Sequence, residues 1–258
     1  KNAFSGSGTA PKIKSYEDYV NLGYDENLVA GVTVAARSPG SWANGIKVAL
    51  VDAKVDQTLG INTTGLAVGY GVTQAITSTL PGTGTTSVLG GELKGVITEI
   101  GTGTIGVKVL SYIPTGGTAT NVDYQPSGVY LFGTTGDLTA TNNSNIGVST
   151  TAVTTAADWF SNQSITLSNS TIAWNTLADR PSTSNYTSTR GGRFDEVHVV
   201  VIDDAGTVTG NAGTILEKHL GLSKAKDAEF SLGSPSYWRK YLASNSEYIF
   251  GGSAPVGI

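Results

Sequence analysis

The sequence contains no cysteine and no methionine, and it has only two histidines. The absence of cysteine excludes a disulfide framework, a zinc ribbon and a thiol nucleophile. His198 and His219 alone cannot form a histidine-rich metal site. The acidic pairs Asp195-Glu196 and Asp203-Asp204 do not match the alternating acidic residues of an EF-hand loop. We therefore expect neither a metal nor a cofactor.

Charge is scarce as well, because only 14% of the 258 residues are charged and the net charge is −4. Phosphate binding requires clustered Lys and Arg, and no such cluster occurs, so we expect no nucleic-acid partner. No stretch approaches the ~20 apolar residues of a membrane span, and we expect no membrane contact. Since the chain begins at Lys1 without a methionine, we also expect it to be a piece of a longer product.

What is present in abundance is glycine, with 34 residues, together with threonine and serine. This composition suits short strands that are joined by many turns. Charge is also unevenly distributed, since residues 57–189 hold 9 of the 36 charged side chains and residues 190–247 hold 15. The shift predicts two differently built regions.

The N-terminal part predicts a linker followed by a β-rich domain. Residues 1–28 are assigned to the linker, although Ser15 could act as the N-cap of a short helical turn over residues 16–20. Residues 29–150 are assigned to a sandwich- or barrel-like β domain. Its expected strands cover residues 46–51, 95–100, 107–112 and 128–132, and its expected exposed loops cover residues 81–86 and 134–149.

The pattern changes after about residue 150, and residues 151–258 predict a partial α/β domain. Helices are expected over residues 155–163 and 214–222, and a third after Ser234-Pro235, where Ser is a good N-cap and Pro a good first helical residue. Strands are expected over residues 194–203, whose continuous Val and Ile suggest burial on both faces, and over residues 248–250. The predicted fold class is therefore mixed, α+β, with a β-rich domain first.

Two sequence motifs suggest chemistry, and we interpret both as structural. Residues 101–106 read GTGTIG and match the dinucleotide fingerprint G-x-G-x-x-G, but β-branched residues follow where that fingerprint needs a helix. A hairpin turn is the better interpretation. Residues 200–206 read VVIDDAG and resemble the aspartate segment of subtilisin-like proteases. Because no separate histidine base or nucleophile segment accompanies them, we expect a polar turn and no catalytic residue.

Four segments together resemble a known family. They read AARSPGSWANGIKV at residues 35–48, DEVHVVVIDD at 195–204, ILEKHLGLSKAKDA at 215–228 and YWRKYLASNSEYI at 237–249. In this order they are similar to segments of the contractile tail sheath proteins of T-even-like myophages. The resemblance covers most of residues 28–250 and is weakest over residues 57–150.

The resemblance implies a structural subunit without enzymatic activity. Such subunits assemble helically around a tail tube on a baseplate and contract to drive genome delivery, so the implied partners are further copies, tube proteins and baseplate proteins. The implied location is the virion tail, after assembly in the host cytoplasm. Family members are usually longer, which implies that their C-terminal domain lies outside this chain. The residues expected at subunit interfaces are Arg37, Trp42, Asn44, Glu217, Lys218, Lys224 and Asp227.

Two other functions remain open. A β-rich binding module, such as a phage or surface adhesin that recognises a glycan or a protein, would use exposed aromatic side chains as a platform. The candidates for this platform are Trp42, Tyr124, Tyr130 and Trp174. A degenerate hydrolase built around Asp203 is the third possibility, and it predicts that Asp203→Asn abolishes an activity.

Overall fold

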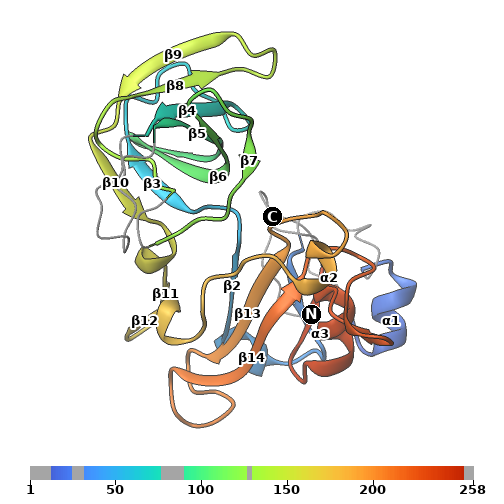
Figure 1. The fold of residues 1–258 in the computed structure, drawn as a ribbon. Coiled ribbons are helices and arrows are strands. Elements are labelled where there is room, and N and C mark those ends of the chain that lie inside the picture. Colours follow the sequence, from blue (N-terminus) through green and yellow to red (C-terminus); the bar gives the residue numbers. More distant parts are fainter. Residues whose placement is uncertain (1–12, 25–31, 77–89, 127–129, 253–258) are drawn as a thin grey trace, which may run out of the picture. The chain divides into compact units, whose positions relative to one another are not determined.

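The computed structural model describes residues 13–24, 32–76, 90–126 and 130–252 (Figure 1). It is strand-rich, with 42% strand and 13% helix, which confirms the predicted mixed, β-rich fold class. The chain forms two compact units. Residues 54–163 make up one, which we call the insert unit. Residues 1–53 and 164–258 together make up the other, which we call the split unit.

This division differs from the expected boundaries after residues 28 and 150. The reason is long-range pairing, because strand β2 (Ile46–Asp52) pairs with β13 (Glu196–Asp203), far along the chain. The described part of the expected linker is also not a linker. Ile13 and Tyr19 are 0% and 1% exposed, and the Tyr19 ring stacks on Phe250 with 4.4 Å between centroids.

The insert unit is built around one antiparallel sheet of eight strands that curls around its core. The sheet order is β10-β3-β6-β5-β4-β8-β9, and β7 pairs with β6. Because the edge strands β9 and β10 follow each other in the chain, the curl brings both edges to one corner. The strands are β3 (Gln57–Gly60), β4 (Gly71–Ala75), β5 (Gly91–Gly101), β6 (Thr104–Pro114), β7 (Thr120–Asn121), β8 (Asp137–Thr141), β9 (Gly147–Ala152) and β10 (Thr155–Asp158).

Alternating residues of these strands form the core of the insert unit. They include Leu59, Leu93, Ile97, Ile105, Val107 and Leu138, all of them fully buried. One ion pair lies in the same interior, where Lys108 Nζ is 2.7 Å from Asp56 Oδ1. A buried charge is tolerated only with such a partner.

The segment GTGTIG is the connection of a hairpin, as predicted. Strand β5 runs into it and β6 runs out of it, and Gly101 is the register partner of Thr104. Gly103 has a φ of +69°, a conformation that favours glycine. A strand follows where a dinucleotide site would need the N-terminus of a helix, so the segment does not form that site.

Two predictions for residues 128–149 of the insert unit were wrong in the part that the structure describes. Residues 134–149 were expected to form a loop, but β8 and β9 occupy much of this stretch because Leu138 and Ala140 alternate into the core. The strand expected over residues 128–132 lies partly outside the described residues, and its described part is not a strand. Instead of strand partners, the backbone N–H and C=O of Phe132 each bond to the Gln57 side chain at 3.0 Å.

The split unit contains a three-stranded antiparallel sheet in the order β14-β13-β2 (Figure 1). Its central strand β13 is buried at every position after Glu196, which confirms the predicted burial on both faces. Smaller pairs join β1 (Val34–Ala36) to β17 (Ile249–Gly251), β11 (Ser164–Thr166) to β12 (Thr171–Ala173) and β15 (Glu229–Ser231) to β16 (Ser234–Pro235).

Its helices are α1 (Tyr16–Asn21), α2 (Asn185–Ser188) and α3 (Trp238–Asn245), with 3-10 turns η1 (Ser41–Gly45) and η3 (Trp174–Thr176). The predicted cap of the first helix is confirmed, because the Ser15 hydroxyl accepts a hydrogen bond from the Asp18 N–H. Helix α3 begins three residues later than expected, with Tyr237 as its N-cap, since Ser234 and Pro235 form β16 instead. Trp238 and Leu242 of α3 pack against the valines of β13.

Two expected helices are strands. Residues 214–222 belong to β14 (Thr214–Ser223), which pairs with β13, so the sheet is antiparallel and the expected α/β layout is absent from it. Residues 155–163 form β10 and the 3-10 turn η2 (Phe160–Asn162) of the insert unit. In both places hydrogen bonds to a neighbouring strand override the local helical spacing.

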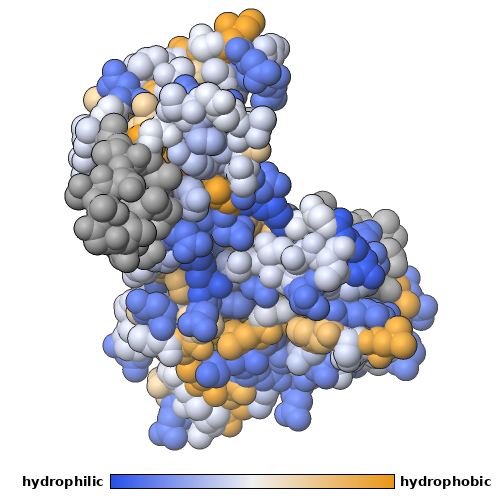
Figure 2. Space-filling model, viewed as in Figure 1, coloured by the Kyte–Doolittle hydropathy of each residue, from blue (hydrophilic) through white to orange (hydrophobic). Residues whose placement is uncertain are grey.

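On the face drawn in Figure 2, hydrophobic residues lie among hydrophilic ones in both units. The exposed apolar side chains include Val68 and Ile146 of the insert unit and Phe230 and Leu232 of the split unit. In the part of the chain that is described, no helix is long and apolar enough to cross a membrane.

Candidate functional site

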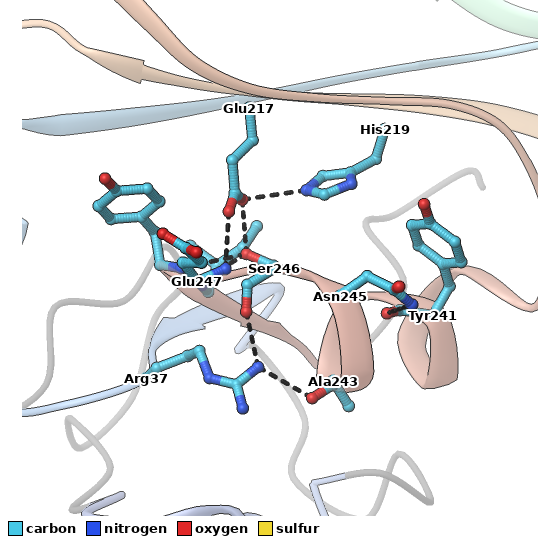
Figure 3. Close-up of polar contacts among 10 residues, drawn as sticks. Arg37, Glu217, His219, Tyr241, Ala243, Asn245, Ser246 and Glu247 are labelled. Atoms are coloured by element: carbon cyan, nitrogen blue, oxygen red, sulfur yellow. Dashed lines mark hydrogen bonds and ion pairs between the residues drawn. The ribbon is translucent and has the colours of Figure 1, made fainter.

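A network of hydrogen bonds around Glu217 joins strand β14 to the end of helix α3 (Figure 3). Glu217 Oε2 accepts hydrogen bonds from Ser246 Oγ at 2.6 Å and from His219 Nε2 at 3.0 Å. Glu217 Oε1 accepts one from the Glu247 N–H at 2.6 Å. Burial raises the pKa of Glu217, but the bonds from His219, Ser246 and Glu247 outweigh it, so this pKa lies below its ordinary value. The carboxylate is therefore ionised at neutral pH.

Arg37 holds the same end of α3 from the other side. Its Nη1 donates to the carbonyl oxygens of Ala243 at 2.9 Å and of Ser246 at 2.7 Å. These oxygens lie at the C-terminal end of the helix, where a positive charge is favourable. The guanidinium also lies over the Phe250 ring, 4.4 Å from its centroid. Arg37 thus ties the helix end to β17.

Ser246 is the residue that connects these contacts. Its N–H donates to Leu242 O at 3.0 Å and so ends α3, while its Oγ accepts from the N–H groups of Tyr248 and Ile249 at 3.2 and 3.0 Å. The chain is therefore fixed at each step from the helix through Glu247 and Tyr248 into β17. Such local side-chain bonds to the backbone stabilise a single turn geometry.

The network contains Ser, His and Glu, the residue types of a hydrolytic triad, but their connections differ. In a triad the histidine lies between the nucleophile and the acid. Here both Ser246 and His219 donate to the Glu217 carboxylate, so the hydroxyl has no histidine to accept its proton. The arrangement anchors backbone and does not activate Ser246.

A pocket of about 230 Å³ opens next to this network. Its walls are Trp42 of η1, Thr207 and Val208 from the turn after β13, and Glu247 and Tyr248. The rings of Trp42 and Tyr248 meet edge to face with 6.1 Å between centroids. The Thr207 hydroxyl donates to the carbonyl oxygen of Trp42 at 3.1 Å, which joins two of the walls.

Asp203 organises the turn that supplies Thr207 and Val208. Its Oδ2 accepts hydrogen bonds from the N–H of Val208 at 3.0 Å and from the N–H and hydroxyl of Thr209 at 2.7 and 2.9 Å. Burial raises the pKa of Asp203, and the bonds from Thr209 and Val208 outweigh it and lower this pKa. A carboxylate whose acceptor positions are used in this way fits the predicted polar turn better than a catalytic role.

The structure brings three of the seven expected interface residues into this region. Arg37 and Glu217 both bind Ser246 at the end of α3, and Trp42 lines the adjacent pocket. Asn44 lies close by in sequence and is exposed on η1. Lys218 is exposed on β14, next to Glu217 in the chain.

The other two expected residues have partners elsewhere in the split unit. Lys224 Nζ lies 3.1 Å from Asp52 Oδ2, and this ion pair links the chain after β14 to the end of β2. Asp227 Oδ2 accepts a hydrogen bond from the Tyr186 hydroxyl at 2.9 Å, close to α2. Neither residue lies at the Glu217 network.

Sequence reasoning missed His219, Ser246, Glu247 and Tyr248 as members of this site. Their sequence signal is weak, because a Ser just after a helix is common. His219 was assigned to a helix. Because residues two apart share a face only in a strand, its position on the same face as Glu217 was missed.

The four aromatic residues considered as a ligand platform do not form one surface within either unit. Trp42 and Trp174 belong to the split unit, where Trp174 is 3% exposed. Tyr124 and Tyr130 belong to the insert unit and pack against its core, and the Tyr124 hydroxyl donates to Asp158 Oδ2 at 3.0 Å.

In the described ranges, no group of three or more His, Asp or Glu side chains is arranged to hold a metal ion. Comparison with known proteins adds no further assignment. No protein-family model, no curated protein sequence and no solved structure matches this chain.

Proposed function

We propose that this chain is part of a structural subunit of a phage contractile tail sheath, a protein that assembles with copies of itself and acts through assembly without enzymatic chemistry. The partners are further copies, the tail tube and the baseplate, and the location is the virion tail. The main support is spatial. The four family-like segments, which are far apart in the sequence, are neighbours in the split unit.

Direct contacts connect these segments. The first one supplies β2, which pairs with β13 of the second, and β13 pairs with β14 of the third. Arg37 of the first segment and Glu217 of the third both bind Ser246 of the fourth. Residues that resemble a family in four places and also pack together are more consistent with a shared fold than with four chance matches.

The stretch that resembles the family least, residues 57–150, belongs to the insert unit. A unit with its own core can vary without disturbing the split unit. The exposed residues of β9 and β10 carry no charge and include the hydroxyls of Thr150 and Thr155, and such uncharged surfaces also suit contacts that can break and form again during contraction.

The test is electron microscopy of the full-length polypeptide that contains this chain, purified and concentrated without other phage proteins. We expect hollow tubes of regular width. Dispersed monomers under several salt conditions would overturn the proposal, and a glycan-binding screen would then test the alternative of a binding module. An adhesin predicts specific retention of one class of glycan, whereas a sheath subunit predicts none.

A further inference from the structure

The pocket formed by Trp42, Thr207, Val208, Glu247 and Tyr248 has the chemistry of a cation site. Two aromatic rings attract a positive charge through their electron-rich faces, and the Glu247 carboxylate adds a full negative charge. Its volume of about 230 Å³ is below the roughly 300–1,000 Å³ that is usual for small-molecule pockets. The size and chemistry therefore suit one long cationic side chain of a protein.

The walls of the pocket are held in place before anything binds. The Glu247 N–H donates a hydrogen bond to the Glu217 carboxylate, and the Tyr248 N–H donates one to Ser246 Oγ. The Trp42 carbonyl oxygen accepts a hydrogen bond from the Thr207 hydroxyl. Because little ordering remains to be done on binding, a contact made here loses less conformational entropy than one at a flexible loop.

The Glu247 carboxylate itself has no cationic partner within the described residues. It is exposed, and only its backbone N–H is engaged. Water satisfies an exposed carboxylate, so Glu247 is free to pair with a cation from outside its own subunit, and the split unit offers exposed lysines that form no ion pair in the described structure. Of these, Lys218 differs from Lys226 and Lys240 because it lies on a strand with the exposed aliphatic side chains Ile215 and Leu220, which are 36% and 38% exposed.

Lys218 cannot reach the pocket of its own subunit. Successive side chains of a strand point to opposite faces, and in β14 Lys218 is opposite Val200 while Glu217 is opposite Val201. Glu217 binds the Glu247 N–H and therefore points to the face that carries the pocket. Lys218 points to the other face of the same sheet.

We propose that the pocket binds Lys218 of a second copy of this chain. The cation enters the pocket beside the Trp42 and Tyr248 rings and pairs with Glu247, while Leu220 or Ile215 contacts Val208. Because the two surfaces differ and lie on opposite faces of the sheet, the contact is head-to-tail, and head-to-tail contacts that do not close produce helical arrays. This inference rests on the proposed self-assembly and names one contact within it.

The direct test is zero-length carbodiimide cross-linking of a mixture of isotopically light and heavy full-length polypeptide, followed by mass spectrometry. We expect a cross-linked peptide pair that joins Glu247 of a light copy to Lys218 of a heavy copy. Absence of this pair in assembled material, where other lysines give intermolecular cross-links, would overturn the inference.

Charge reversal provides a second test. Glu247→Lys alone and Lys218→Glu alone each place like charges together, and we expect each to weaken association by about tenfold or more. The double variant, and an equimolar mixture of the two single variants, should recover assembly. Lys226→Glu is the matched control and should assemble like the parent protein. Failure of the double variant to recover would contradict the pairing.

The outcomes separate this contact from the proposed function. If Glu247→Lys forms tubes as well as the parent protein and the parent tubes lack the cross-link, the contact is overturned and the sheath assignment stays intact. The cross-link in small oligomers, without tubes under any condition, would support the contact and count against the sheath assignment. Both single variants should melt at the temperature of the parent protein when monomeric, because neither side chain has a partner in the described structure to lose.

Discussion

At the scale of single residues, Glu217 is the side chain on which most of the candidate site depends. Glu217→Ala would leave Ser246 Oγ, the Glu247 N–H and His219 Nε2 without their acceptor. Unsatisfied buried groups cost about 1–3 kcal/mol, so we expect a loss of that order in the free energy of unfolding of the split unit. Urea unfolding of the monomer measures it. Glu247→Ala, an exposed change, should stay within about 0.5 kcal/mol, and equal losses for both variants would contradict this role.

Acid sensitivity is a second prediction at the residue scale. Burial raises the pKa of Asp195, but hydrogen bonds from Ser223 and Ser184 outweigh it, and the net pKa values of Asp195, Asp203 and Glu217 are all lowered. A lowered folded-state pKa stabilises the fold above the unfolded-state pKa, which is about 4 for carboxyls. This stability is lost as the pH falls through the folded-state values.

We therefore expect circular dichroism to report weakening of the split unit as the pH is lowered from about 5 towards 2. Asp203→Asn, which removes one of these titrating groups, should make the decline shallower. A stability that stays constant over this range would contradict the assignment of these three carboxylates.

At the scale of elements, the β5–β6 hairpin depends on one backbone conformation. Gly103 has a φ of +69° and open space where a side chain would be, so Gly103→Ala tests conformation alone. We expect a loss of about 1 kcal/mol in the stability of the insert unit. Gly147→Ala in β9 is the control substitution, because this glycine also faces open space but its φ is not positive. We expect this substitution to leave the stability of the insert unit unchanged or to raise it slightly. Thermal unfolding compares the stability of the two variants. If Gly147→Ala is the less stable variant, the hairpin geometry is contradicted.

At the scale of the whole molecule, the division into two compact units predicts that the insert unit can fold without the split unit. Every member of the insert-unit core lies between residues 59 and 153. We expect residues 54–163 expressed alone to give a β-type circular dichroism spectrum and cooperative thermal unfolding. Leu93→Ala, at a fully buried position, should lower the stability by about 2–5 kcal/mol. An unfolded fragment, or no effect of this variant, would show that the insert unit depends on the rest of the chain.

Local sequence patterns were sufficient for several features. The glycine-rich hairpin connection at residues 101–106, the Ser15 cap and the buried run of β13 were all predicted from turn chemistry, capping and composition. Each of these depends on residues within about one turn or one strand of each other. The polar turn at Asp203 belongs to the same class, because the hydrogen bonds of its carboxylate reach only as far as Thr209.

Short-range periodicity and backbone preference are thus enough to predict the β-rich class, the turns and the most buried strand. They do not predict the strand at residues 214–223, because the hydrogen bonds that outweigh its helical spacing come from β13. Nor do they predict that residues 1–53 share a unit with residues 164–258. The meeting of Arg37, Glu217 and Ser246 depends on this long-range pairing, which no local pattern encodes.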